Sequence, residues 1–159
     1  MKITKAKVVY NLLINIPVSS ILTITAQFLT HQDFIVYWQD FVINFAISFP
    51  IAMMIGLFMP LMGLGKWFTA AFGVKNDTYT HNMAYRLLAT FFISVIYSLI
   101  LSPLSYLINQ LIFNPGFSVI QYIFDCLKTI PVMIGVGFMS SLFFDIPAYR
   151  VAHKIDPEF

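Results

Sequence analysis

The sequence is poor in charge and has only one cysteine, and both scarcities exclude whole classes of protein. Only 10% of its 159 residues are charged, whereas soluble domains carry about 25%, so a water-exposed surface cannot be built from this composition. Cys126 stands alone, which excludes an internal disulfide and a metal site made of several cysteines. Its apolar neighbours favour a small buried side chain. The lysines are scattered, without the basic run that would predict nucleic-acid binding.

Sequence motifs of catalysis are missing as well. His31, His81 and His153 fall in polar connections or the tail, without the paired spacing of a metal site. Neither a nucleophile elbow nor a glycine-rich phosphate loop occurs. We therefore predict a protein that is not an enzyme and that uses neither a metal nor a cofactor.

Four long apolar runs dominate the rest of the chain. They cover about residues 8–30, 34–62, 83–113 and 117–144, and each exceeds the roughly 20 residues that cross a hydrocarbon core about 30 Å thick. Backbone groups inside lipid must be satisfied within each segment, which favours helices. We predict an all-α fold, a single transmembrane domain over 1–159 built as a four-helix bundle in the lipid bilayer. Pro147 is expected to end the fourth helix, and the KWFTAAF segment should form a helix on the membrane surface.

The distribution of basic residues predicts the orientation in the membrane. With four spans, the N-terminus, the connection at 63–82 and the C-terminus share one side. Eight of the nine basic residues belong to that side: Lys2, Lys5, Lys7, Lys66, Lys75, Arg86, Arg150 and Lys154. Cytoplasmic loops are enriched in Lys and Arg, so we predict a multi-pass protein of a bacterial plasma membrane with both termini in the cytoplasm.

Polar residues recur in the apolar runs with a spacing that indicates an internal duplication. Asp40, Asn44, Ser48 and Pro50 correspond, at an offset of 81 positions, to Gln121, Asp125, Thr129 and Pro131, and Gly56 to Gly137. The first and third runs match at an offset of 75, with Asn11, Asn15, Ser19, Thr23 and Gln27 over Arg86, Thr90, Ser94, Ser98 and Ser102. We predict two helix-pair repeats, about 8–62 and 83–144, in the same orientation and joined by a cytoplasmic linker at 63–82.

The residues that carry this pattern also support a resemblance. Trp38, Asn44 and Phe49-Pro50 in one half, with Asp125 and Ile130-Pro131 in the other, are similar to a family of small two-repeat bacterial membrane proteins catalogued only as a domain of unknown function. The resemblance covers nearly the whole chain. It implies the fold and the membrane location, and it implies no activity.

Asp125 and Lys128 form the most specific candidate site. They are three positions apart and therefore on one helical face, and an unpaired charge at such depth costs about 2.5–3.5 kcal/mol. We expect them to form an ion pair, joined in an intramembrane binding cluster by Asp40, Asn44 and Gln121. Pro50 and Pro131 each remove one backbone hydrogen bond and should kink their helices beside this cluster.

Two functions remain open from the sequence. The polar cluster favours a protein that binds a small solute or ion, or passes it across the membrane. The alternative is a structural or accessory subunit that packs against a membrane partner or self-associates. The hydroxyl stripes at Ser19, Thr23, Ser94, Ser98 and Ser102 favour close helix packing, whereas Asn11 and Asn15 need hydrogen-bond partners and should face inward.

Overall fold

The computed structural model describes residues 3–31, 35–59, 61–74, 83–113 and 118–157. These residues form five helices and no strand: α1 (Lys5–His31), α2 (Trp38–Phe58), α3 (Leu61–Ala71), α4 (Met83–Phe113) and α5 (Val119–Ile155). All except α3 are long and apolar enough to cross a membrane. The predicted all-α fold with four candidate spans is therefore confirmed.

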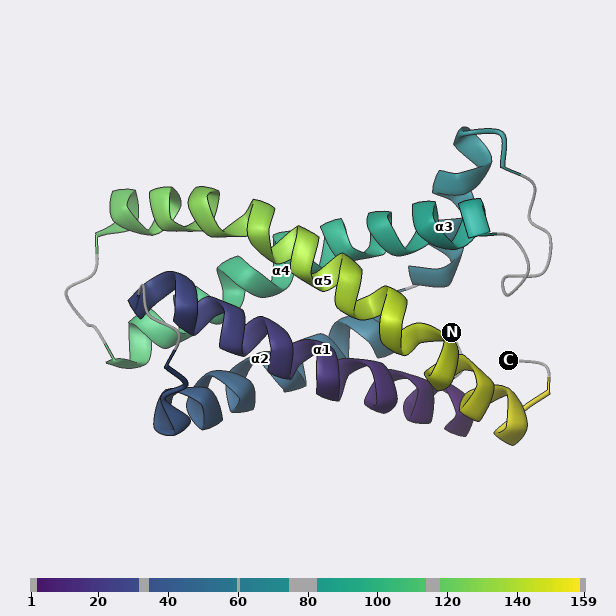
Figure 1. The fold of residues 1–159 in the computed structure, drawn as a ribbon, viewed down its shortest axis with the longest axis horizontal. Coiled ribbons are helices and arrows are strands. Elements are labelled where there is room, and N and C mark those ends of the chain that lie inside the picture. The colour runs from purple at the N-terminus through teal and green to yellow at the C-terminus, as the bar shows by residue number, and fades with distance from the viewer. Residues whose placement is uncertain (1–2, 32–34, 60, 75–82, 114–117, 158–159) are drawn as a thin grey trace.

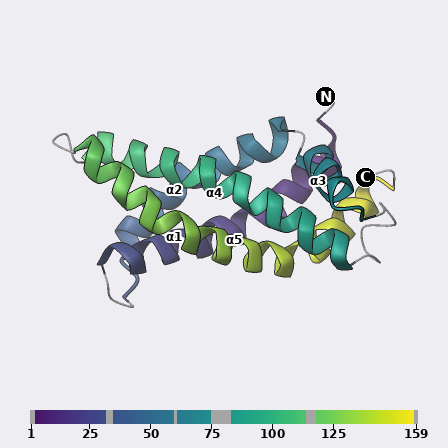
Figure 2. The same cartoon turned by 90° about the horizontal axis from the view of Figure 1, so that it is seen from above.

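The four long helices close into a ring. α1 packs against α2 and α5, and α4 packs against the same two helices, so α1 and α4 occupy opposite corners. Successive long helices alternate in direction, which brings both termini and α3 to one end of the molecule (Figure 1 and Figure 2). We call this the terminal end; α1 and α4 finish, and α2 and α5 begin, at the opposite end.

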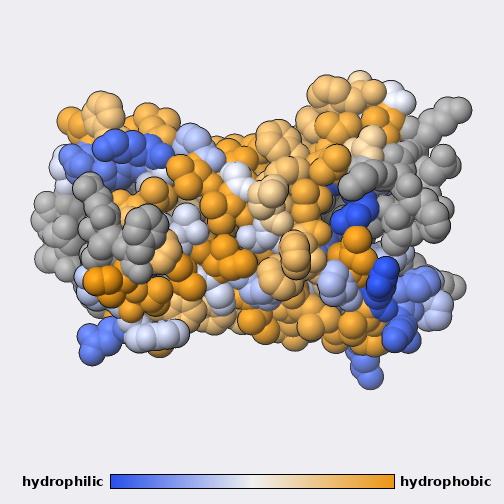
Figure 3. Space-filling model, viewed as in Figure 1, coloured by the Kyte–Doolittle hydropathy of each residue, from blue (hydrophilic) through white to orange (hydrophobic). Residues whose placement is uncertain are grey.

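Burial in the bundle is the reverse of that in a soluble protein. Many large apolar side chains are exposed, including Val42, Met54 and Phe143. On the face drawn in Figure 3, the middle is mostly hydrophobic and hydrophilic residues gather towards the two ends. The interior instead holds small residues such as Ala52 and Ala89, together with many polar side chains. Small interior residues let helices approach closely, as lipid-embedded bundles require.

The expected end of the fourth span at Pro147 was wrong. α5 runs on as a helix to Ile155 and contains both Pro131 and Pro147. A proline removes one backbone hydrogen bond without excluding the helix on its far side. Here the two turns after Pro147 place Ala148 and Ala152 at 1% and 0% exposure, so packing in the bundle stabilises the helix beyond its proline.

The expected short helix in the connection between the two halves is present as α3. Its Phe68 ring stacks on Phe92 of α4 with centroids 4.2 Å apart, while Trp67 and Phe72 are exposed. α3 therefore packs on α4, with the Phe68–Phe92 stack among its contacts, while the Trp67 ring is exposed. Its location at a membrane surface stays a prediction.

Candidate functional site

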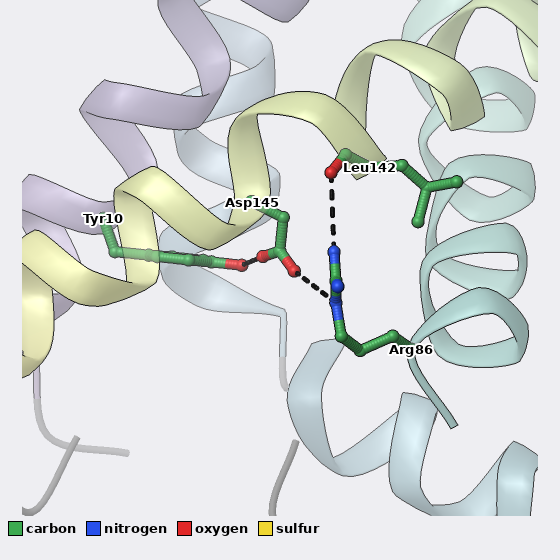
Figure 4. A network of polar contacts seen from close by, with 4 residues as sticks. All are labelled: Tyr10, Arg86, Leu142 and Asp145. Carbon is green, nitrogen blue, oxygen red and sulfur yellow. Dashed lines mark hydrogen bonds and ion pairs between the residues drawn. The ribbon is translucent and has the colours of Figure 1, made fainter. Parts of the chain in front are cut away.

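A charged network joins three helices near the terminal end. The Tyr10 hydroxyl of α1 donates a 2.5 Å hydrogen bond to Oδ1 of Asp145 in α5. Arg86 of α4 places its Nε 3.9 Å from the other carboxylate oxygen, and its Nη2 donates to the Leu142 carbonyl at 3.5 Å. Figure 4 shows the three side chains converging between their helices.

The two charged side chains are almost removed from solvent, and Tyr10 is partly buried. The Asp145 side chain is 3% exposed and that of Arg86 is 12% exposed. A charge buried in this way is costly unless an opposite charge and hydrogen bonds compensate it, and here the guanidinium and the phenol share that role. Arg86 Nε is itself buried without a hydrogen-bond partner among the described residues, because 3.9 Å is an ion-pair distance and exceeds that of a hydrogen bond.

The network lies at one end of a longer set of buried polar side chains, which we call the polar interior. All of its members are less than 9% exposed, and they come from each of the four long helices: Asn11, Asn15, Ser19, Thr23 and Gln27 of α1, Ser48 of α2, Thr90, Ser94 and Ser98 of α4, and Ser140 and Asp145 of α5. The inward orientation expected for Asn11 and Asn15 is thus confirmed.

Side chains of the polar interior link neighbouring helices at several levels. Asn15 Nδ2 lies 3.5 Å from the Ala52 carbonyl of α2, and the Tyr97 hydroxyl of α4 donates to the same oxygen at 3.2 Å. Thr23 Oγ1 and Ser48 Oγ are 3.4 Å apart. At the opposite end, Gln27 bonds to both the backbone N–H and the carbonyl of Tyr37. Polar contacts therefore recur along the length of the bundle.

The predicted ion pair between Asp125 and Lys128 was wrong. The Asp125 carboxylate accepts hydrogen bonds from Tyr106 of α4 at 2.9 Å and from Gln121 at 3.1 Å, and Lys128 is exposed. Asp125 faces α4, where the phenol reaches it, while Lys128 shares the exposed side of α5 with Phe124 and Leu127. Spacing along α5 suggested a shared face, but Asp125 meets Tyr106 of α4 whereas Lys128 is exposed.

The other members of the predicted cluster are divided between two helices. Asp40 and Asn44 lie in the first two turns of α2, where Asn44 Nδ2 donates to the Asp40 carbonyl at 2.8 Å. Gln121, Asp125 and Lys128 belong to α5, which packs on α1 and α4. Within the described ranges, no three His, Cys, Asp or Glu side chains gather into a potential metal site.

Sequence reasoning missed the network at the terminal end. Arg86 was noted as a topology signal and as the counterpart of Asn11 in the duplication, and Asp145 falls just beyond the expected fourth run. One signal could have revealed them, because each is an isolated charge at the edge of an apolar run and both edges were expected on the same side of the membrane. Opposite charges at matching depth in neighbouring spans are natural partners.

Four apolar helices around a polar interior indicate a multi-span membrane protein. Comparison with protein-family models, curated proteins and solved structures finds no match for this chain. The resemblance drawn from the duplicated proline motifs therefore stays a prediction.

Proposed function

We propose that this protein is a four-span protein of a bacterial plasma membrane whose polar interior binds a small polar solute or ion and lets it cross. One observation carries the proposal: buried polar side chains from all four long helices run along the bundle, while large apolar side chains are exposed. Hydroxyl stripes alone could serve helix packing. Buried amides and a buried carboxylate–guanidinium pair exceed what close packing requires.

In this proposal the two ends of the bundle have different roles. At the terminal end, Tyr10, Arg86 and Asp145 form a charged constriction that a solute must pass or bind. At the opposite end, Asp125 with Tyr106 and Gln121 provides the first polar groups that a solute meets. Asp40, Asn44 and Lys128 add polarity at that end of the molecule, each from its own helix face.

The duplicated arrangement belongs to the same proposal, and one pair of contacts supports it. A Cβ on Gly56 would lie 2.8 Å from the Tyr97 hydroxyl, and a Cβ on Gly137 would lie 3.8 Å from Leu22. Gly137 corresponds to Gly56 at the offset of 81, and Tyr97 corresponds to Leu22 at the offset of 75. The same approach between the halves thus occurs twice with their roles exchanged, and this supports the proposed two-fold relation of the halves.

Flux measurements on purified protein in liposomes test the passage. Three probes cover the chemistry: urea for small uncharged solutes, sodium for cations, and protons followed with an enclosed pH-sensitive dye. We expect at least one probe to cross faster than in empty liposomes. The double variant Arg86→Met, Asp145→Leu should lose this flux, because it removes both charges of the constriction while filling their space.

The flux measurement is decisive only when the reconstituted protein is well folded. If the protein is helical and monodisperse yet no probe crosses faster than in empty liposomes, passage is excluded and the accessory-subunit alternative takes its place. If the double variant has the same flux as the original protein, the solute still crosses, but Arg86 and Asp145 take no part in its passage.

A further inference from the structure

Two hydroxyls in the middle of the bundle have no hydrogen-bond partner within the described ranges. Ser19 of α1 is 1% exposed and Ser94 of α4 is 4% exposed. Neither Oγ atom bonds to any residue that the structure describes. Buried polar atoms without partners are rare in proteins, and each one calls for an explanation such as a bound water or ion.

Several other helical hydroxyls of this protein bond within their own helix, unlike these two serines. A hydroxyl within a helix ordinarily bonds back to the carbonyl four residues earlier. Five others do so, at 2.7–3.0 Å: Ser20, Thr25, Thr69, Thr129 and Ser140. Ser19 and Ser94 could donate to the carbonyl four residues earlier in their own helices but form no such bond. Their hydroxyls therefore point elsewhere in the interior.

We infer that the two serines lie at a similar level of the bundle, because residues near each of them meet the same partners. Asn15, one turn from Ser19, and Tyr97, three residues from Ser94, both donate to the Ala52 carbonyl. Gly137 lies beside Leu22, three residues beyond Ser19, and also beside Ser98, one turn beyond Ser94. We define Asn15, Ser19, Ser94 and Ser98 as the central layer. Ser19 and Ser94 also correspond to each other at the offset of 75.

We propose that the central layer binds a small uncharged polar molecule, of the size of water or urea, between the Ser19 and Ser94 hydroxyls. A serine hydroxyl both donates and accepts, so the layer suits a molecule that does both. The layer holds hydroxyls and an amide without a charged side chain, and the charged network of the polar interior lies at the terminal end. A bare ion there would lose its hydration without a compensating charge. This inference rests on the proposed passage and names its substrate class.

Thermal unfolding in detergent tests the occupancy of the layer independently of flux. Ser140→Ala is the matched control, because Ser140 is also buried but bonds back to Val136 at 2.7 Å. If a molecule bridges the two serines, Ser19→Ala and Ser94→Ala each remove one of its partners and should lower the Tm below that of Ser140→Ala. A Tm equal to or above that control overturns the inference, because deleting an unsatisfied buried hydroxyl relieves a cost.

Flux through liposomes then tests the substrate class. We expect water or urea to cross, sodium to be excluded, and the double variant Ser19→Val, Ser94→Val to reduce the uncharged flux to that of empty liposomes. If sodium crosses, the solute is not restricted to uncharged molecules, but the proposed passage still holds. If water or urea still crosses in the double variant, only the binding site between Ser19 and Ser94 is wrong. If no probe crosses, passage is wrong, and the unfolding measurements alone decide whether the layer binds a molecule.

Discussion

Asp145 carries a carboxylate at a position where almost none of its surface is exposed. The side chain is held by a phenol from α1 and a guanidinium from α4, so one residue of α5 joins three helices. A buried charge with its partner removed is strongly unfavourable, whereas a pair replaced by apolar groups of similar size is often tolerated. The network therefore makes a quantitative prediction about stability.

We expect Asp145→Leu alone to lower the free energy of unfolding by about 3–5 kcal/mol, because it leaves the Arg86 guanidinium buried without a carboxylate. Arg86→Met alone should cost a similar amount. The double variant should recover most of the loss. Thermal unfolding in detergent, followed by circular dichroism, measures all three.

Asp125→Asn is the control for this series. Asp125 is only partly buried and bonds to Tyr106 and Gln121, so the substitution removes a charge that no buried cation depends on. It should cost less than either single change in the network. A double variant that is as unstable as the sum of its singles would contradict the description of Arg86 and Asp145 as a coupled pair.

At the scale of the helices, α1 can approach α2 closely because Gly56 of α2 has no side chain. A Cβ at Gly56 would overlap Oδ1 of Asn11 and lie 2.8 Å from the Tyr97 hydroxyl. Asn11 cannot simply turn away, because its Nδ2 donates to the Lys7 carbonyl at 2.8 Å. We expect Gly56→Ala to lower the free energy of unfolding by about 1–3 kcal/mol, the usual cost of overpacking, measured by thermal unfolding.

Gly135 in α5 provides the matched comparison. A Cβ there meets nothing within 4 Å, and alanine is favoured over glycine within a helix by about 1 kcal/mol. Gly135→Ala should therefore leave stability unchanged or raise it. Should Gly56→Ala be as stable as Gly135→Ala, the close contact of α1 with α2 described here would be wrong.

The elements themselves were largely predictable from the sequence, and their neighbours were not. Apolar length predicted four spans, and the third was predicted at Met83–Phe113, the bounds of α4. Two inferences failed for physical reasons. Proline chemistry suggested an end at Pro147, but the packing of Ala152 retains the helix. Helical spacing paired Asp125 with Lys128, but Tyr106, from another helix, bonds to that carboxylate, and no local pattern encodes such a contact.

At the scale of the whole molecule, the structure places both termini and α3 at one end (Figure 1). The basic residues predict that this end faces the cytoplasm. Reporter fusions at Phe159 and within 75–82 should therefore give a cytoplasmic signal, and fusions at Gln32 and Gly116 an external one. An external signal at Phe159 would contradict the orientation, and equal signals at Phe159 and Gln32 would contradict the count of four spans.

The ring that α5 closes also sets an order for biogenesis. Tyr10 and Asp145 are 135 positions apart in the chain, so α1 is synthesised and inserted long before its partner carboxylate exists. The α1–α2 hairpin already contains its own links, from Lys7 to the Leu57 carbonyl and from Thr23 to Ser48. Several polar groups of this hairpin therefore have hydrogen-bond partners before the later helices are inserted. Arg86 has no such local partner in the network, and its charge is neutralised only when the last helix emerges from the ribosome and docks.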